Sequence, residues 1–538
     1  MGHKMRALGV LLLISCSYSY IIESDDPTES ILWPTEYHLK GEKTDLSVGL
    51  VEPFEIWYSA ELNRSRKDVY EGLDKTFYYS ETDETTGKVY KVYPEANEDL
   101  EYADLCREDK HKGDIVDFLP KIDEYVYSGE EKYNEKVVQV WKFESSDSDG
   151  DTNSVLYVYR NDDGVDIPVR NETKRYNEWT KALTTHIIIY YYDFKLPNED
   201  DLDVSNIEAC EDKKIKRNTK KHKKNGISSE VSRAFHKYKH QHKKQYKNKE
   251  HKMRKAIFEK NWRKVIAHNR KNLSYKLSIN QFSDRTEEEL KHLTATSPSP
   301  HGVGSVDFPH TEEELTTIVA DLPENFDMRL DGVISHIKNQ GSCGSCWAFS
   351  TTAAVEGALA RNNGGRNLDL SEQSLIDCAW SYNNGGCDGG FLDGAFKYIV
   401  EHGIPSQREY GTYLAEDGHC AVKNMSEVLK VKGFARVPPR SINAMKYALY
   451  KYGPVSVAIY AGDSFVQYSS GIFYDIECTD QPRINHGVTV VGYGVRDDTT
   501  YWIVKNSWGE DWGQDGYALM SATNDNCNTL TEAYYPVV

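Results

Sequence analysis

Two cysteines three residues apart stand in the stretch NQGSCGSCWAFS, and their spacing allows three kinds of chemistry. Cys343 and Cys346 could form half of a zinc site, a redox dithiol, or two thiols with separate roles. A zinc site of this type needs two further ligands in a comparable turn, and the chain contains no second C-x-x-C. A thioredoxin-like pair follows a strand in a βαβ unit, a context that is missing here. The two cysteines are therefore predicted to have different roles.

Cys346 stands where a thiol is easily ionised. The alanine-rich sequence that follows it, WAFSTTAAVEGALA, is typical of a helix, and NNGG at 362–365 is typical of a helix end. The N-terminus of a helix favours negative charge, because its dipole and its unpaired N–H groups point at the first residues. Cys343 precedes this helix in a Gly/Ser-rich loop that suits a disulfide. Cys346 is therefore the predicted nucleophile.

A thiolate nucleophile needs a base, and the base needs a partner that fixes its tautomer. His486 opens a β-branched strand sequence, GVTVVGYG, and Asn506 and Trp508 follow in YWIVKNSWGEDWG. We expect His486 to reach Cys346 and the Asn506 side-chain carbonyl to accept the other imidazole N–H. Trp508 would shield that hydrogen bond from water. A histidine taken alone is more often an ordinary residue than a base, so the interpretation depends on the combination.

These segments resemble the papain and cathepsin family of cysteine proteases. The signature C-G-S-C-W stands at 343–347, and His486 falls within the usual spacing of about 130–150 residues from the nucleophile, with Asn506 slightly beyond it. The resemblance covers 322–538. It implies Cys346 as nucleophile, His486 as general base and then acid, and Asn506 as the residue that orients it. It also implies that Gln340 donates a side-chain N–H to the oxyanion hole.

The fold class implied by the resemblance is α+β, with a papain-like protease domain of two lobes. A helical lobe, at about 330–430, and a β-barrel-like lobe, at about 430–538, would meet at the active-site cleft. The resemblance implies peptide-bond hydrolysis through a Cys-His-Asn mechanism, with no cofactor and no metal expected. The rival interpretation is a catalytically dead binding or storage protein, but Cys346, His486, Asn506 and Gln340 are all present.

The resemblance also implies a substrate site, in which the backbone of a glycine pairs with an extended peptide and apolar side chains form the S2 pocket. The predicted substrate-binding residues are Gly390, Phe391, Leu392, Ala458, Ile484, Trp508 and Leu530. Leu530 would form the floor of S2, so an aliphatic or aromatic P2 side chain is expected. The segment WSYNNGG at 380–386 is too short for the occluding loop of cathepsin B-like enzymes, which favours endopeptidase activity.

The ten cysteines give a second route to Cys346. Cys16 lies in a predicted signal peptide, so an odd number remains in the mature chain and one thiol is left unpaired. The family pattern would pair Cys343 with Cys387, Cys378 with Cys420, and Cys478 with Cys527. Cys106 and Cys210 are then left to pair with each other, and Cys346 stays free.

The sequence before 322 resembles a cathepsin L-type propeptide. Residues at steps of three and four place one polar-and-apolar face on a helix: Glu250, Arg254, Phe258, Asn261, Val265 and Asn269. This face resembles the ERFNIN pattern, with Val265 in place of Ile. Asn280, Phe282 and Asp284 resemble the motif that follows it, with Ser278 in place of Gly. The segment 231–321 is therefore predicted to be an inhibitory propeptide that crosses the cleft in the direction opposite to substrate.

Composition divides the rest of the chain. Lys4, Arg6 and the short apolar run after them predict a signal peptide at 1–19. Residues 20–212 are acidic and rich in tyrosine, and their strand-like runs at 136–144, 154–160 and 185–194 predict an antiparallel β sandwich or half-barrel. A basic linker is expected at 213–230. No apolar run reaches the roughly 20 residues of a membrane span.

These features predict a protein of the secretory pathway, found in a lysosome or lysosome-like granule or outside the cell. Sequons at Asn63, Asn171, Asn272 and Asn424 are candidate glycosylation sites. The net charge of −19 argues against nucleic acid as a partner. The expected partners are protein and peptide substrates, the chain's own propeptide, and cystatin-type inhibitors. The whole architecture resembles insect haemocyte cathepsin-like proteinases with long N-terminal extensions.

Overall fold

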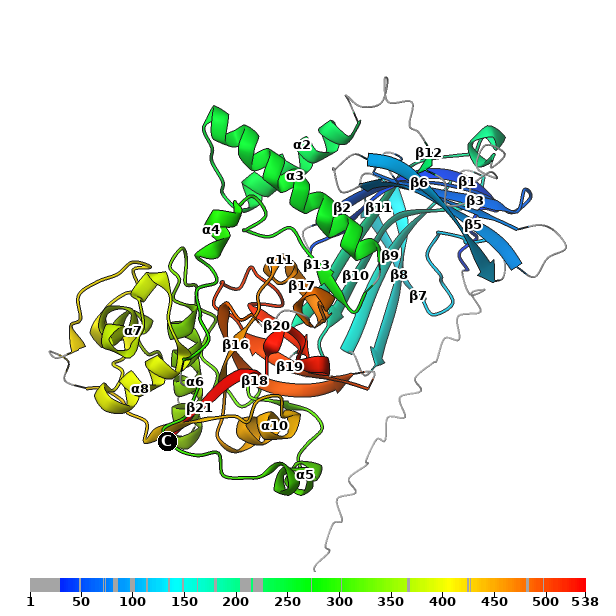
Figure 1. Ribbon diagram of the computed structural model, residues 1–538. Coiled ribbons are helices and arrows are strands. Elements are labelled where there is room, and N and C mark those ends of the chain that lie inside the picture. Colours follow the sequence, from blue (N-terminus) through cyan, green and yellow to red (C-terminus); the bar gives the residue numbers. More distant parts are fainter. Residues whose placement is uncertain are drawn as a thin grey trace, which may run out of the picture.

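Figure 1 shows the computed structural model of the chain, in which a β domain, a helical segment and a protease domain follow one another. The structure describes residues 30–47, 50–70, 72, 74–80, 86–96, 102–112, 115–133, 136–147, 150–161, 163–178, 181–203, 214–215, 226–271, 273–300, 302–364, 368–422, 425, 427–479, 483–496 and 498–538. The predicted signal peptide, most of the predicted linker, Cys210, and the sequons at Asn272 and Asn424 lie outside these residues.

The β domain is one antiparallel sheet of twelve strands in the order β12-β6-β5-β4-β3-β2-β1-β11-β10-β9-β8-β7. The strands are β1 (Glu36–Asp45), β2 (Leu50–Ser59), β3 (Arg64–Val69), β4 (Asp74–Tyr79), β5 (Thr86–Ala96), β6 (Tyr102–Lys112), β7 (Val126–Tyr133), β8 (Lys136–Asp147), β9 (Gly150–Arg160), β10 (Asp166–Tyr176), β11 (Leu183–Lys195) and β12 (Lys214–Ile215). The three predicted strand runs are confirmed as β8, β9 and β11. The β-rich domain is confirmed. Its strands form a single strongly twisted sheet (Figure 1), so of the two predicted arrangements, a sandwich or a half-barrel, the sandwich of two sheets is wrong.

Segments outside the strands cover parts of this sheet and give it small cores. Tyr37 and Leu39 of β1 pack with Leu119, which lies in the segment between β6 and β7. Leu156 and Val158 of β9 pack with Ile31, which precedes β1. Long connections therefore bury parts of the sheet that a second sheet would cover in a sandwich.

Helices α2 (Gly226–Gln241) and α3 (Asn248–Arg270) follow, and then β13 (Tyr275–Leu277), α4 (Glu287–Lys291) and α5 (Glu312–Ala320). Helix α2 begins at Gly226, inside the segment expected to be linker. The predicted helix face is confirmed on α3, since Phe258 and Val265 are buried. Asn261 donates to the Ser283 carbonyl at 2.9 Å, and Asn269 donates to the Leu277 carbonyl at 2.8 Å. The polar members of the face thus bind the chain that folds back along the helix.

The first half of the protease domain is helical. It contains α6 (Cys346–Asn362), α7 (Glu372–Cys378), α8 (Leu392–His402) and α9 (Gln407–Tyr410). The predicted helix after Cys346 is confirmed, and it is buried along most of its length because small residues such as Ala354 and Ala358 let the second lobe approach closely. Its strongest strand contact is with β18 of that lobe, so α6 lies where the two lobes meet.

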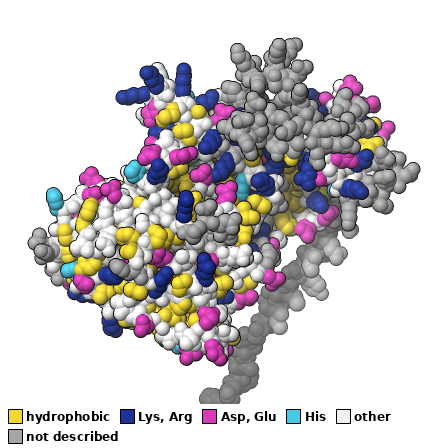
Figure 2. Space-filling model, in the orientation of Figure 1, with side chains coloured by type: hydrophobic (Ala, Val, Ile, Leu, Met, Phe, Trp, Pro, Cys, Tyr) yellow, Lys and Arg dark blue, Asp and Glu magenta, His cyan; other side chains and the backbone are white. Residues whose placement is uncertain are grey.

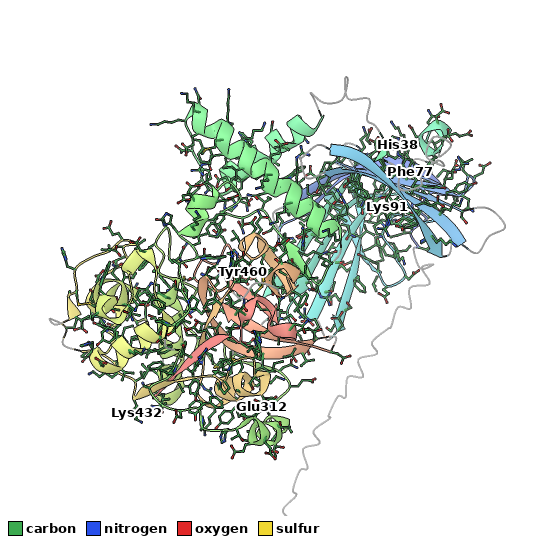
Figure 3. The ribbon with its side chains drawn as sticks, viewed as in Figure 1. His38, Phe77, Lys91, Glu312, Lys432 and Tyr460 are labelled. Atoms are coloured by element: carbon green, nitrogen blue, oxygen red, sulfur yellow. A yellow bond between two sulfur atoms is a disulfide. The ribbon has the colours of Figure 1, made fainter. Side chains whose placement is uncertain are left out.

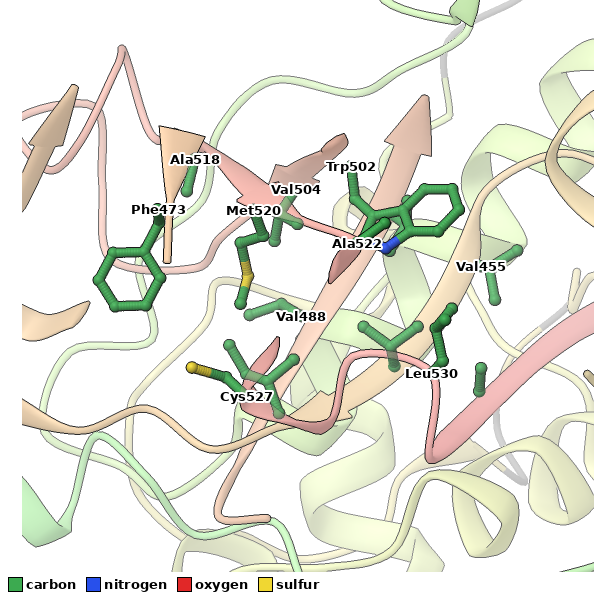
Figure 4. Packing of buried hydrophobic residues seen from close by; sticks show 14 of the residues in the cluster. Val455, Phe473, Val488, Trp502, Val504, Ala518, Met520, Ala522, Cys527 and Leu530 are labelled. Carbon is green, nitrogen blue, oxygen red and sulfur yellow. The ribbon is translucent and has the colours of Figure 1, made fainter. Parts of the chain in front are cut away.

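The second half is built around a sheet in the order β13-β17-β20-β19-β18-β16-β21-β15, with the short β14 beside β18. Its elements are β14 (Phe326–Asp327), β15 (Gly433–Arg436), α10 (Ile442–Lys451), β16 (Val455–Ile459), α11 (Asp463–Val466), β17 (Tyr468–Phe473), α12 (Ile476–Thr479), β18 (His486–Arg496), β19 (Thr499–Lys505), β20 (Tyr517–Ser521) and β21 (Glu532–Val537). Figure 4 shows its core, where Val488, Trp502 and Met520 pack together from three strands. The predicted α+β fold is confirmed.

Disulfides close the loops of both lobes. Cys343–Cys387, Cys378–Cys420 and Cys478–Cys527 are bonded, as the family pattern implied. Cys106 is disulfide-bonded as well, and its predicted partner Cys210 lies outside the described residues. Within the described part of the chain, Cys346 is the free cysteine. No helix in that part is both long and apolar enough to cross a membrane.

The two described sequons lie in different structural environments. Asn63 lies in the turn between β2 and β3 with φ at +52°, whereas Asn171 lies inside β10 between β9 and β11, with its side-chain oxygen buried. We therefore expect a glycan on Asn63 and none on Asn171. Enzymatic glycan release in heavy-oxygen water, followed by mass spectrometry, should mark Asn63 as aspartate and leave Asn171 unchanged. An Asn63→Gln variant is the control, and a mark on Asn171 would contradict the placement.

Candidate active site

Cys346 is fully buried at the first position of α6, and the two residues predicted to activate it approach from the other lobe. His486 begins β18 beside Ile459 of β16, and Asn506 follows the last residue of β19. Because β18 and β19 are neighbouring antiparallel strands, the start of one lies next to the end of the other. The sheet therefore brings His486 and Asn506 together although they are far apart in sequence.

Hydrogen bonds fix the imidazole. Nε2 of His486 lies 2.9 Å from Oδ1 of Asn506, and Trp508 stacks on the imidazole with 4.6 Å between ring centroids. Oδ1 of Asn506 also accepts the Ser507 backbone N–H at 2.8 Å, which holds its orientation. Among the described residues Nδ1 of His486 has no other hydrogen-bond partner, so this nitrogen is left for the sulfur. All of these side chains are buried.

The charge of His486 determines the ionisation of Cys346. Burial by itself raises the pKa of the thiol, but the positive charge and hydrogen bond of His486 outweigh it. The Thr296 hydroxyl and the Gly487 N–H add to the lowering, and the pKa of Cys346 falls from 9.0 to about 7. A buried thiolate is therefore available near neutral pH, in the form in which cysteine attacks carbonyl carbon.

Gln340 is held on every side. Its backbone N–H donates to the Ser507 carbonyl at 2.9 Å, its side-chain oxygen accepts from the Ser507 hydroxyl at 2.7 Å, and its carbonyl accepts from Tyr413 at 2.8 Å. These bonds leave the amide Nε2 as the free end, which donates to the carbonyls of Cys343 at 3.0 Å and Leu293 at 3.3 Å. Leu293 belongs to the chain before the protease domain, so the predicted oxyanion donor is already occupied.

The same upstream segment runs through the cleft. Thr296 forms a parallel bridge with Gly390, and the backbone bonds on either side of it are both 3.1 Å long. The Thr296 N–H donates to Asn485 at 2.9 Å, and its hydroxyl lies 3.1 Å from the sulfur of Cys346. A side chain on Gly389 would come within 2.2 Å of the Ala295 carbonyl, so glycine is required at this contact.

The predicted S2 residues do not all meet in one cluster. Leu392, Ala458 and Ile484 share a buried apolar cluster with residues of the helical lobe. Phe391 is half-buried at the start of α8, and Gly390 precedes it. Leu530 lies in the neighbouring core of the second lobe. The structure thus brings three of the predicted wall residues together and places the predicted floor residue in the adjacent core.

Sequence reasoning missed Glu532. This residue is the cross-strand partner of Ala458, so both lie on the same face of the sheet. Its carboxylate accepts the Ser299 backbone N–H at 2.8 Å and the Tyr534 hydroxyl at 3.1 Å, and burial raises its pKa. An acidic residue at the start of an otherwise apolar strand, two residues after Leu530, was the available signal.

Two sequence families match the chain at these segments. A model of the papain family cysteine protease matches residues 322–537, and a model of the cathepsin propeptide inhibitor domain (I29) matches 235–290. The tomato (Solanum lycopersicum) "Cysteine proteinase 3" is 41% identical over 308 residues, which are 57% of this chain and 84% of that protein. The mouse (Mus musculus) pro-cathepsin H is 39% identical over 300 residues, or 55% of this chain and 88% of that protein.

A solved structure agrees with these sequence matches. The digestive procathepsin L2 proteinase of Tenebrio molitor larval midgut superimposes with a TM-score of 0.53 and 34% identity, covering 57% of this chain and all of that one. The mouse procathepsin L is 37% identical over 318 residues, which cover 57% of this chain and 92% of that protein. The chain therefore belongs to the papain family of cysteine proteases, in its cathepsin L-like branch, and is made as a zymogen with a cathepsin-type inhibitory propeptide.

Proposed function

We propose that the protein is an endopeptidase zymogen in which Cys346 is the nucleophile, His486 the base and acid, and Asn506 the orienting residue. One observation carries this proposal: the free buried thiol has its pKa lowered to about 7 by an imidazole whose other nitrogen is fixed at 2.9 Å by Asn506. A catalytically dead scaffold has no need of a thiol kept ionisable in this way.

In the proposed reaction, the sulfur of Cys346 attacks the scissile carbonyl carbon, and the carbonyl oxygen becomes an oxyanion. The amide Nε2 of Gln340 and the backbone N–H of Cys346 stabilise that oxyanion. As the C–N bond breaks, the imidazolium of His486 gives its proton to the leaving amine, and a thioester remains on the sulfur. Water then attacks the thioester with His486 as base, which releases the carboxylate and restores the ion pair.

Substrate must first displace the propeptide, because both use the same groups. In the zymogen Gln340 Nε2 donates to Leu293, Gly390 pairs with Thr296, and Asn485 accepts from Thr296. Once these groups are free, an extended peptide can take their place and Trp508 can border the leaving-group side. Cystatin-type inhibitors would compete for the same cleft.

The S2 pocket is proposed to accept two kinds of side chain. Leu392, Ala458 and Ile484 provide apolar walls, with Phe391 at the rim, which suits the hydrophobic P2 residues expected from the sequence. Glu532 adds a carboxylate beside Ala458 that propeptide residue Ser299 reaches in the zymogen. A basic P2 side chain could therefore extend along the walls and pair with Glu532, whereas Leu530 would contribute from behind.

The proposed division of the chain is a signal peptide at 1–19, a β domain at 20–212, a linker at 213–230, a propeptide at 231–321 and a protease domain at 322–538. The three disulfides of the protease domain support folding in an oxidising compartment. We therefore place maturation in the secretory pathway, with a lysosome, a lysosome-like granule or the cell exterior as the destination.

The central test is the Cys346→Ser variant. Processed wild-type protein should hydrolyse a fluorogenic peptide and take up one equivalent of an epoxide inhibitor on Cys346. The variant should lose at least about 10⁴-fold in kcat, because a hydroxyl of ordinary pKa is not ionised by an imidazole. Circular dichroism should show that the variant is folded. Retained activity, or a label on another residue, would exclude the proposed mechanism.

The role of Glu532 is tested by Glu532→Gln, which removes the charge and keeps the shape. For a substrate with arginine at P2, kcat/KM should fall about tenfold or more, while a leucine substrate should change less than about twofold. Because burial raises the pKa of Glu532, the preference of the wild type for arginine over leucine should increase as the pH rises and the carboxyl ionises. Equal losses on both substrates would contradict a role in specificity.

Acid activation is tested at Glu289, which binds Arg254 of α3 at 2.5 and 2.7 Å. The hydrogen bond from Arg254 lowers the pKa of Glu289 from 4.5 to about 2. The ion pair therefore stabilises the docked propeptide fully above about pH 4.5 and progressively less as the pH falls toward 2. Processing of the wild-type zymogen should accelerate over this range. The Glu289→Gln variant can keep the helix cap with Thr286. It should be processed faster than the wild type at pH 6–7, and its processing rate should increase less when the pH is lowered.

The neighbouring Glu288→Gln variant is the control, since Glu288 pairs with the exposed Lys291 of its own helix at 2.9 Å. It should process like the wild type at every pH. The role of the Arg254 ion pair would be rejected if processing of the wild type were independent of pH, or if the two variants behaved alike.

A further inference from the structure

The β domain contacts the propeptide through a face of α3 that the inhibitory pattern does not use. Trp262, Ile266 and Arg270 recur at steps of four, so they form a second stripe along the helix. Trp262 and Ile266 are buried, at 4% and 8% exposure, although neither belongs to the face that binds the folded-back chain. Tyr70 and Val69 of the β domain pack in the same cluster, beside residues of α2.

The contacts of this second stripe are specific. Tyr70, in the turn between β3 and β4, meets Trp262 edge to face with 5.4 Å between ring centroids. Arg270 pairs with Asp74 at the start of β4, and its guanidinium lies 5.4 Å from the ring centroid of Tyr93 on β5. We call these six residues the β–α3 interface: Tyr70, Asp74 and Tyr93 on the sheet, and Trp262, Ile266 and Arg270 on the helix.

The backbone conformation of Tyr70 indicates that its contact with α3 is specific. Its φ is +52°, a region that a large side chain rarely occupies, and its N–H donates to the Pro53 carbonyl at 2.9 Å. Such strain persists only where the surroundings hold it. Here the strained turn places the Tyr70 ring in one cluster with Val231 and Phe235 of α2 and with Phe258 and Trp262 of α3.

Charged side chains surround the same place. A cavity of 410 Å³ beside the interface is lined from the sheet by Lys43, Lys75 and Lys91, and from the propeptide by Arg270 and Lys276. Figure 3 shows Lys91 on the part of the sheet that lies near the end of α3. Asp45, Glu52 and Asp74 line the cavity as well, and Asp74 pairs with Arg270. The interface thus depends on one matched ion pair as well as on the aromatic contact.

A cavity separates part of the β domain from the protease domain. It has a volume of 660 Å³ and is lined by Leu183 and Thr184 of β11 on one side and by Glu510 and Asp515 on the other. The protease domain is instead bound by the propeptide, through the pairing of β13 with β17 and through Gln281, which donates to the Trp508 carbonyl at 3.0 Å. In Figure 1 α3 runs from a projecting end toward the sheet and β13, and basic side chains gather at the projecting end (Figure 2).

We propose that the β domain functions as a second restraint on the propeptide: by binding a second face of α3 it keeps the inhibitory helix folded and the zymogen latent. The inhibitory face of α3 holds the chain that folds back along the helix, and the β–α3 interface binds the neighbouring face. Unfolding of α3 then requires both sets of contacts to break. Cleavage of the propeptide, which needs an unfolded chain, is slowed accordingly.

The test uses the full-length zymogen with two substitutions on the β domain, outside the propeptide. Asp74→Asn removes the ion pair, and Tyr70→Asn removes the ring while asparagine tolerates the positive φ. Each should shorten the time to convert full-length chain into mature enzyme about tenfold at a fixed acidic pH. Arg270→Gln should do at least the same, because it also loses the contact with Tyr93, and the double variant Asp74→Asn/Arg270→Gln should be no faster than Arg270→Gln alone, because the ion pair is already broken.

Asp151→Asn is the matched control, since Asp151 pairs with Lys181 at 2.7 Å within the β domain and away from α3. It should activate at the wild-type rate. A second measurement avoids any dependence on catalysis: hydrogen exchange of the α3 amides in a Cys346→Ser zymogen. Asp74→Asn should speed exchange along α3 in that background, and Asp151→Asn should not.

Two results would overturn the proposal. One is wild-type activation and wild-type exchange in both Asp74→Asn and Tyr70→Asn. The other is faster exchange of α3 with an unchanged activation rate, which would make the interface a structural contact with no influence on latency. Failure of the Cys346→Ser test of catalysis would leave the exchange measurement intact, so the two proposals are tested separately.

Discussion

A charged sulfur in a buried position is the constraint around which the protease domain is organised. Removing an ion from water is costly unless a counter-charge and hydrogen bonds replace the solvent. The helix lobe provides Cys346 at the start of α6, and the sheet lobe provides His486 at the start of β18. Because His486 makes the largest contribution to lowering the pKa of Cys346 to about 7, neither lobe can create the thiolate alone. The cleft has to lie between the lobes.

The residues next to the pair extend this dependence. Ser507 binds both predicted functional amides: its N–H donates to Asn506 and its hydroxyl donates to Gln340. The orientation of the proposed base, His486, and that of the proposed oxyanion donor, Gln340, are therefore linked through one residue. Tyr413 adds a second link, since its hydroxyl bonds the Gln340 carbonyl and lies 2.7 Å from the hydroxyl of Ser345, directly before the nucleophile. Such a network leaves few alternative arrangements for the amide of Gln340.

In the zymogen the propeptide occupies the polar groups of the cleft. The propeptide satisfies the hydrogen bonds that substrate would make, at Gln340, Gly390 and Asn485, so the cleft is filled and its polar groups are paired. The helix α3 lies far from the sulfur, yet it supports this segment through the chain that folds back along it. The β domain is attached to a neighbouring face of that helix. Each of the three parts thus acts on the cleft through the part next to it.

Much of this site could be predicted from the sequence because local signals specify it. The C-x-x-C pair, the alanine-rich run after Cys346 and the spacing to His486 indicated a helix-end nucleophile and its base. The step of three and four residues indicated the inner face of α3, and the odd number of cysteines indicated a free thiol. These features are periodic or short-range, or they match a family pattern, so they can be recognised in a single sequence.

The tertiary structure decided what depends on registers between distant segments. Glu532 faces Ala458 only because β21 pairs with β16 in one particular register, and a strand sequence does not state its partner. In the same way, the runs that predicted strands could not distinguish a sandwich from the single twelve-stranded sheet. The second face of α3 could not be assigned a role from the sequence. Trp262, Ile266 and Arg270 act through contacts with Tyr70 and Asp74, which lie almost two hundred residues earlier. The propensity to form a helix or a strand depends on neighbouring residues, so it can be inferred from the sequence. Which distant strands and helices contact one another depends on how they pack, and only the tertiary structure shows this.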